Sequence, residues 1–317
     1  MIITVTLNPS LDRTLRVQSL RRGAVQRALR NDTDPGGKGV NVARALSAHG
    51  TPVVTVLPVG GTTGDSLVAR LVEAGVDHVA VPGESRTRAN VSIVEPDGTT
   101  TKINEPGVAL SERELRAVTD AVIARVHPGD WVVTAGSLAP GQDPEAYAAI
   151  GRAARAAGAR WAVDTSGVAL SASLTARPDL VKPNREELSE VLGVGLDTLA
   201  DVVTACDGLV NGNGLTVLCS LGADGAVLVD RDHAWHGTGP RVQVENTVGA
   251  GDALLAGYLH GLTVDGSPAA GLRAGIAWAT AAVATPGTGV PAPELVRPDD
   301  VHITEAALAT LTHLENA

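Results

Sequence analysis

The chain has 317 residues, a length that suits one large α/β domain or about two domains of roughly 150 residues each. Hydrophobic residues make up 44% of it and charged residues 19%, a composition that excludes a disordered chain. Phe is absent, only 4 Trp and 2 Tyr are present, and 35 acidic residues outnumber 25 basic ones to give a net charge of -10. Few stacking aromatics and a negative charge both argue against a nucleic-acid partner.

The two cysteines, Cys206 and Cys219, cannot build a disulfide framework or a cysteine-based zinc site. This favours a reducing, cytoplasmic location. The first residues, MIITVTL, lack a basic n-region, so they predict a first strand and not a signal peptide. No apolar stretch approaches the ~20 residues that cross a bilayer, so we expect no membrane association.

Short β-branched runs alternate with helical patterns along most of the chain. This alternation predicts βαβ units, and hence an α/β fold with a mostly parallel central sheet whose ligands gather at the carboxyl ends of the strands. The expected strands are Ile2 to Leu7, Val53 to Leu57, Trp131 to Thr134, Trp161 to Asp164, Leu180 to Lys182 and Thr216 to Ser220. The expected helices are Val40 to His49, Asp65 to Ala74, Glu112 to Val126, Pro144 to Ala157 and Arg185 to Leu192.

Two segments, at about 13–33 and 86–105, interrupt this rhythm with alternating or Thr-rich runs and no long helix. We expect them to insert a small β lid into a single domain spanning 1–317. Exposed strand edges on such a lid predict a homodimer that pairs through it. After residue 248 the pattern is helical, with expected helices at Ala250 to Leu262, Pro268 to Ala284 and Glu305 to Leu314.

The strongest local motif is NTVGAGD, which runs from Asn246 to Asp252 and leads into an apolar helical pattern. Glycines at a helix start expose backbone N–H groups, and these form an anion site together with the helix dipole. Taken alone, the motif is equally compatible with an ordinary N-terminal turn. It is not a dinucleotide fingerprint, because Leu254 stands where the third glycine is needed.

A second group of polar residues follows the first strand. Asp12 ends the sequence NPSLD and could hold two hydroxyls of a polyol, although a lone Asp is more often part of a simple turn. Gly37, Lys38 and Asn41 open the next helix, in the sequence GGKGVN. This glycine run is not a P-loop, because Gly39 stands where Ser or Thr must bind magnesium.

Four motifs in order resemble the PfkB, or ribokinase-like, family of sugar kinases. They are GGKGVNVARAL, KPNREEL at Lys182 to Leu188, SLGADGAVL at Ser220 to Leu228 and NTVGAGDALLAG at Asn246 to Gly257. NPSLD and NEPG look most like the branch that holds 1-phosphofructokinases and tagatose-6-phosphate kinases. The resemblance runs from residue 1 to about 290. It implies a three-layer α/β/α sandwich with a β lid.

The resemblance also implies roles for individual residues. Asp252 matches the catalytic base, and the three residues before it match the anion hole for the transferred phosphoryl group. Arg88 and Lys102 fall where the family holds the phosphate already on the substrate. Glu187 matches the acid of the N-x-x-E motif, which acts indirectly on Mg2+. The other matches are Gly249, Ala250 and Gly251 in the anion hole; Asp12, Gly37, Lys38 and Asn41 on the sugar side; and Lys182, Asn184, Ser220, Gly222 and Gly225 on the nucleotide side.

The resemblance implies an enzyme that uses ATP and Mg2+ to phosphorylate a small sugar phosphate. We expect a 1-phosphofructokinase, which phosphorylates the 6-hydroxyl of fructose 1-phosphate to give fructose 1,6-bisphosphate. Tagatose-6-phosphate kinase is the alternative within this branch, and a nucleoside or ribose kinase would have less need for two lid cations. A non-catalytic sugar-phosphate sensor is the rival from another class, and the intact GAGD motif argues against it.

Overall fold

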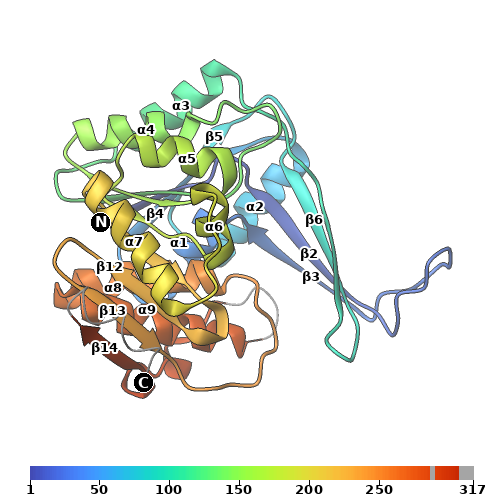
Figure 1. Cartoon of the computed structure of the whole chain (residues 1–317). Helices are drawn as coiled ribbons and strands as arrows, with labels where there is room; N and C mark the ends of the chain where they lie inside the picture. Colours follow the sequence, from blue (N-terminus) through green and yellow to red (C-terminus); the bar gives the residue numbers. More distant parts are fainter. Residues whose placement is uncertain (286–289, 307–317) are drawn as a thin grey trace.

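The computed structural model describes residues 1–285 and 290–306, and it is built around a large sheet and a small one (Figure 1). The large sheet has ten strands in the order β14-β13-β12-β11-β10-β9-β8-β1-β4-β5. The seven strands from β11 to β5 in this order pair in parallel with their neighbours. At the other end of the sheet, β11, β12, β13 and β14 pair antiparallel. The strands are β1 (Ile2–Val5), β4 (Val53–Val59), β5 (His78–Pro82), β8 (Trp131–Ala135), β9 (Arg160–Asp164), β10 (Leu180–Val181), β11 (Thr216–Ser220), β12 (Ala226–Val229), β13 (Ala234–Thr238) and β14 (His302–Ala306).

Helices cover both faces of the large sheet and give the molecule three layers (Figure 1). One face packs against α1 (Lys38–Ala48), α2 (Gly61–Glu73), α8 (Ala250–Asp265) and α9 (Pro268–Val283). The other packs against α3 (Glu112–Ile123), α4 (Ala146–Ala156), α5 (Gly167–Thr175), α6 (Arg185–Leu192) and α7 (Leu199–Asn213). The central strands are buried on both sides, as β8 shows with five consecutive buried residues.

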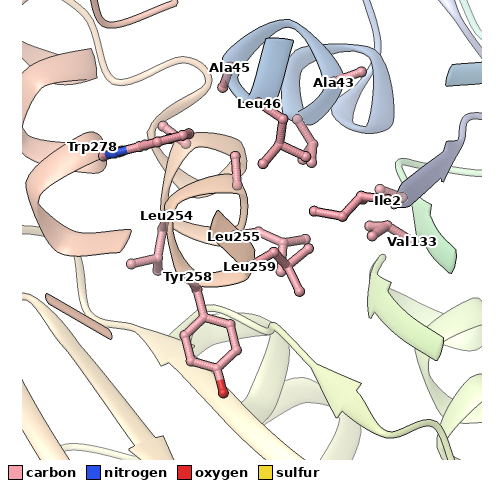
Figure 2. Close-up of a cluster of buried hydrophobic side chains, with 14 of the residues drawn as sticks. Ile2, Ala43, Ala45, Leu46, Val133, Leu254, Leu255, Tyr258, Leu259 and Trp278 are labelled. Atoms are coloured by element: carbon pink, nitrogen blue, oxygen red, sulfur yellow. The ribbon is translucent and has the colours of Figure 1, made fainter. Parts of the chain in front are cut away.

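The aliphatic core fixes the orientation of α8, the helix that begins with the GAGD motif. Leu255 and Leu259 of α8 extend toward Ile2 of β1 and Val133 of β8, and Leu46 of α1 lies beside them (Figure 2). All five side chains are at most 2% exposed. Their burial anchors α1 and α8 side by side on the sheet, so both helices begin near the carboxyl ends of its central strands.

The small sheet has the order β3-β2-β6-β7 and extends away from the three layers (Figure 1). Its strands are β2 (Ser10–Arg16), β3 (Arg30–Gly36), β6 (Arg88–Val94) and β7 (Thr100–Asn104), drawn from the two segments in which lid strands were expected. The first segment supplies β2 and β3, and the second supplies β6 and β7. The sheet is joined by the parallel pairing of β2 with β6, so it needs both segments.

The predicted α/β class, the six sequence-predicted strands and the helices at 250–262 and 268–284 are confirmed, with small changes at their ends. The helix expected at Glu305 to Leu314 is wrong at its start, because 302–306 forms β14 and pairs with β13. Residues 307–314 of that prediction lie outside the described residues. In the part of the chain that the structure describes, no helix is long and apolar enough to span a membrane.

Candidate active site

The candidate site lies where the carboxyl ends of β1 and β9 meet the first turns of α1 and α8. Asp252, in the first turn of α8, is only 7% exposed. Asn41 of α1 donates a hydrogen bond from its Nδ2 to Asp252 Oδ2 at 2.8 Å. This bond joins two residues that are 211 positions apart in the sequence.

The surroundings of Asp252 suit a group that exchanges protons near neutral pH. Burial, and then the negative charge of Asp164, raise the pKa of Asp252 to about 6, against the opposing effects of Lys38, Asn41 and Lys182. A carboxyl group with a pKa near the working pH can accept a proton and release it again. Asp252 therefore has the properties of a general base.

Asp164, at the end of β9, is the central buried charge of the site and was not among the residues singled out in the sequence. Lys38 Nζ lies 2.7 Å from its Oδ1 and Lys182 Nζ lies 3.1 Å from its Oδ2. Burial alone would raise the pKa of Asp164, but the two lysines hold it below its usual value. The carboxylate therefore stays ionised and forms ion pairs with two cations, Lys38 at the start of α1 and Lys182 after β10.

Lys38 also approaches Glu187, with 3.7 Å between Nζ and Oε1. Burial alone would lower the pKa of Lys38, but Asp164 and Glu187 raise it above its usual value, so the ammonium group stays charged. Its side chain keeps 35% exposure, which leaves room for a ligand to reach it. Lys38 thus stands between the carboxylates and the open side of the site.

The start of α8 is built to receive an anion. Gly249, the N-cap, has φ 82°, a left-handed conformation that favours glycine, and it caps the helix with no side chain. Among the described residues no acceptor is bonded to the backbone N–H of Gly251 or Asp252, whereas the N–H of Ala250 reaches Thr247 O at 3.4 Å. A Cβ built on Gly251 would lie 3.2 Å from Lys182 Nζ. The Lys182 ammonium group therefore lies beside the start of α8, close to Gly251.

On the small sheet, Asp12 lies at the centre of a polar network. Its Oδ1 accepts hydrogen bonds from Ser10 Oγ at 2.7 Å and Asn90 Nδ2 at 2.9 Å. A Cβ on Gly36 would come within 2.3 Å of this carboxylate, so only glycine fits opposite it. Among the described residues, no hydrogen bond reaches the second oxygen of Asp12.

The two expected phosphate-binding cations occupy different environments. Arg88 is half-buried, and it donates to Asn8 O at 3.2 Å, Glu105 O at 2.9 Å and Asn90 Oδ1 at 3.2 Å. Burial lowers its pKa somewhat, and Asp12 and Glu105 oppose that effect. Lys102 lies on the edge strand β7 opposite Ser92 and is exposed. The strand register places both on the Asp12 face of the small sheet, with Lys102 farther from the large sheet.

The residues expected on the nucleotide side lie beyond Lys182. Asn184 and Glu187 form a reciprocal capping box at the start of α6, in which each side chain accepts from the other's backbone N–H. Ser220 is the last residue of β11, and its N–H donates to Pro183 O at 3.0 Å. The turn from Gly222 to Gly225 has positive φ at both ends, and a Cβ on Gly225 would come within 1.9 Å of Gly237 O.

The donor set fits a magnesium ion held mostly by phosphates. Glu187 keeps Oε1 directed toward Lys38 while its Oε2 caps α6. Asp164 is fully buried and pairs each of its oxygens with a lysine, so Glu187 is the carboxylate that a metal ion can reach. In residues 1–285 and 290–306 no group of three or more acidic, His or Cys side chains could enclose a metal ion. One or two carboxylates plus substrate phosphates are the usual surroundings of Mg2+ in phosphoryl-transfer enzymes.

Comparison with known proteins places this site in a family. The model of the pfkB family carbohydrate kinases matches residues 6–295. The chain is 40% identical to the 1-phosphofructokinase of Rhodobacter capsulatus, over 92% of this chain and 93% of that protein. It is 36% identical to the ATP-dependent 6-phosphofructokinase isozyme 2 of Escherichia coli, over 90% and 94%.

Among solved structures, the tetrameric inhibited form of phosphofructokinase-2 from Escherichia coli superposes with a TM-score of 0.86 and 34% identity. The match covers 93% of this chain and 99% of that one. The family match across most of the chain, the shared three-layer fold and the motifs gathered around Asp252 agree with one another. The chain belongs to the PfkB family of carbohydrate kinases.

Proposed function

We propose that the chain is an ATP-dependent 1-phosphofructokinase that transfers a phosphoryl group to the 6-hydroxyl of fructose 1-phosphate. The observation that carries this proposal is the buried Asp252, held by Asn41 beside the Lys38–Asp164–Lys182 bridge. It lies between the polar face of the small sheet and the nucleotide-side loops. The site therefore has a base and cations between two ligand-binding surfaces.

The reaction needs one proton transfer and one in-line displacement. Asp252 accepts the proton of the sugar 6-hydroxyl as that oxygen forms a bond to the γ-phosphorus of ATP. The bond from the γ-phosphorus to the bridging oxygen then breaks and ADP leaves. The free N–H groups of Gly251 and Asp252, together with Lys38 and Lys182, stabilise negative charge on the transferred group.

The negative charge of the ATP phosphates would be offset by a bound magnesium ion. Glu187 is the residue that would hold it, directly or through water. Glu187 also caps α6, so its position is fixed before any ligand arrives. Arg88 binds the phosphate of the substrate, and Lys102 is a weaker second cation for it.

Fructose 1-phosphate is preferred because the 1-phosphofructokinase of Rhodobacter capsulatus is 40% identical to this chain. Tagatose 6-phosphate carries its phosphate and free primary hydroxyl at opposite ends of a furanose and fits the same groups with the ring reversed. Fructose 6-phosphate must be tested as well, because a 6-phosphofructokinase isozyme is 36% identical.

The deciding experiment measures kcat/KM for these three sugar phosphates with Mg-ATP in one assay. We expect fructose 1-phosphate to win by at least about tenfold, a margin equal to about 1.4 kcal/mol of transition-state binding. A larger value for either competitor would overturn the substrate assignment and leave the kinase mechanism standing. Tight binding of fructose 1-phosphate with no turnover would favour a sensor instead.

We also propose that the chain forms a homodimer through the small sheet. Strand register places Leu15, Val91, Ile93 and Ile103 on the face opposite Asp12 and Asn90. Ile103 is 59% exposed and the other three are partly exposed. An apolar sheet face of this kind is stabilised when a second copy covers it.

Light scattering at micromolar concentration tests the dimer. We expect Ile103→Asp to give monomers, because it places a charge in the covered face. Val168→Asp, at a 71% exposed valine on α5, is the matched control and should stay dimeric. A fully active wild-type monomer would contradict this proposal.

A further inference from the structure

A second cavity, of about 330 Å³, lies at the opposite ends of α1 and α8 from the candidate active site. It is bounded by the last turns of α8, the first half of α9 and the segment 293–298, and the residues that matter here are His49, Val264, His260, Ala270, Arg273 and Trp278. Its volume suits a small molecule. At 1.5 Å per residue, the 13 residues from Asp252 to Asp265 place its rim about 20 Å from the base.

Arg273 supplies the cavity with a positive charge. Its Nη1 donates to Val301 O, and its other donors make no hydrogen bond among the described residues. In residues 1–285 and 290–306 no carboxylate forms an ion pair with this guanidinium group. A half-buried arginine without a carboxylate partner attracts an anion that can accept two parallel hydrogen bonds.

His260 offers a neutral donor on a neighbouring wall. Its Nδ1 lies 2.7 Å from the hydroxyl of Thr51, which is 7% exposed. Burial, and then His49, lower the pKa of His260, so the ring is neutral at pH 7. When the Thr51 hydroxyl donates to Nδ1, the ring hydrogen is on Nε2, and no described residue accepts from that atom.

The remaining walls are apolar and rigid. The ring of His49 stacks on Trp278 with 3.8 Å between centroids, and His49 Nε2 donates to Pro291 O at 2.9 Å. Val264 and Ala270 add aliphatic surface. Asp265 lies on the rim of the cavity, Glu294 lies beside His49, and Asp299 and Asp300 follow the lining residue Pro298. All four are exposed, where water and salt screen them.

We propose that this cavity is a regulatory site for a small organic anion, a carboxylate or phosphomonoester with a compact apolar body. The anion binds Arg273 and His260, and its apolar body packs on Val264 and Ala270. Two of the elements that line the cavity lead back to the candidate active site: α8 carries Asp252 at its other end, and His49 caps α1, which carries Asn41 in its first turn. Asn41 and Asp252 are bonded to each other. A ligand that shifts one helix against the other therefore moves the base, a consequence that rests on the proposed kinase function.

Isothermal titration with benzoate as the probe tests the binding site. We expect saturable binding that weakens at least tenfold in Arg273→Gln and in Ala270→Leu, which fills the cavity. Arg70→Gln, at an exposed arginine of α2, is the matched control, and Arg88→Gln excludes binding at the substrate site. Phenyl phosphate should bind in the same way, whereas inorganic phosphate and benzyl alcohol, each of which lacks one half of the ligand, should bind much more weakly.

Equal benzoate affinity in wild type, Arg273→Gln and Ala270→Leu would overturn the site, and so would the absence of saturable binding to wild type. If Arg273→Gln does not fold, Ala270→Leu and His260→Gln decide the question. The regulatory role has its own readout. Saturating benzoate should change kcat/KM for the sugar phosphate at least twofold in wild type and not in Arg273→Gln. An unchanged kcat/KM in wild type would exclude the regulatory role, whereas the binding site would still stand on the titration.

Discussion

The two halves of the candidate site are built differently. Around Asp164, the charges are buried in the large sheet and neutralise one another, with Lys182 only 3% exposed and Asp164 fully buried. On the small sheet, Arg88 is half-buried and Lys102 is exposed on an edge strand. The groups proposed to meet developing charge are thus preorganised at low dielectric, whereas the groups proposed to hold the charge already on the substrate remain hydrated.

This difference predicts where a substitution acts. Changes at the buried half should reduce the rate or destabilise the fold, because its charges have no water to replace a missing partner. Changes on the small sheet should raise KM and leave the fold intact. The four predictions below test that division.

The largest effect is expected for Asp252→Asn, which keeps the shape and removes the proton acceptor. We expect kcat to fall by at least about 10²-fold. The pKa of Asp252 is raised from 3.8 to about 6 in the folded protein. The folded state is therefore less stable once the pH has risen through this range, because the buried carboxyl group must then ionise. The variant should therefore be at least as stable as wild type at pH 7 in urea denaturation, and near-normal turnover would exclude Asp252 as the base.

Asp164→Asn should lower the free energy of unfolding, by about 3–5 kcal/mol, because it leaves Lys38 and Lys182 without the charge that binds both. Urea denaturation at pH 7 measures the change. Asp120→Asn, at an exposed position on α3, is the control and should stay within about 0.5 kcal/mol of wild type. A loss below about 1 kcal/mol for Asp164→Asn would show that water reaches the bridge.

On the small sheet, Arg88→Gln should raise KM for the sugar phosphate about tenfold or more, and Lys102→Gln only a few-fold. Both should leave KM for ATP nearly unchanged. Arg88 is held in place by three acceptors, whereas exposed Lys102 must lose side-chain freedom to bind. Steady-state kinetics in both substrates measure the split, and equal effects of the two variants on KM for the sugar would contradict the distinction.

The sequence predicted much of this arrangement, and the reason differs from residue to residue. Asp252, Lys38 and Asn41 stand in motifs at helix starts, so local pattern alone placed them at the carboxyl edge of the sheet. The contact between Asn41 and Asp252 could not be predicted from spacing, because it joins two βα units that meet only when both helices pack on one face.

Asp164 was missed although a signal existed. It ends the sequence-predicted strand Trp161 to Asp164, and the rule that drew attention to Asp12 at the end of the first strand applies equally there. Lys102 shows the opposite case. Its position in the chain grouped it with Arg88, but only the pairing of β7 with β6 reveals that it lies on an exposed edge. The helix expected from Glu305 overlaps the end of β14, where Glu305 and Ala306 pair with β13. A strand at the end of a sheet is specified by its partner more than by its own residues.

The pH dependence of kcat/KM, which reports the free enzyme, tests the buried half without any substitution. With the pKa of Asp252 at about 6, the base is mostly ionised at pH 7 and mostly protonated at pH 5. We therefore expect kcat/KM to fall about tenfold between pH 7 and pH 5, with an acid limb centred near pH 6. Asn41→Ala removes a hydrogen bond that favours the ionised form, so it should move this limb to higher pH, whereas Lys102→Gln should not move it. An acid limb near pH 4 in wild type would mean that Asp252 is hydrated in the free enzyme, and the contrast between a buried catalytic half and a hydrated substrate half would then fail.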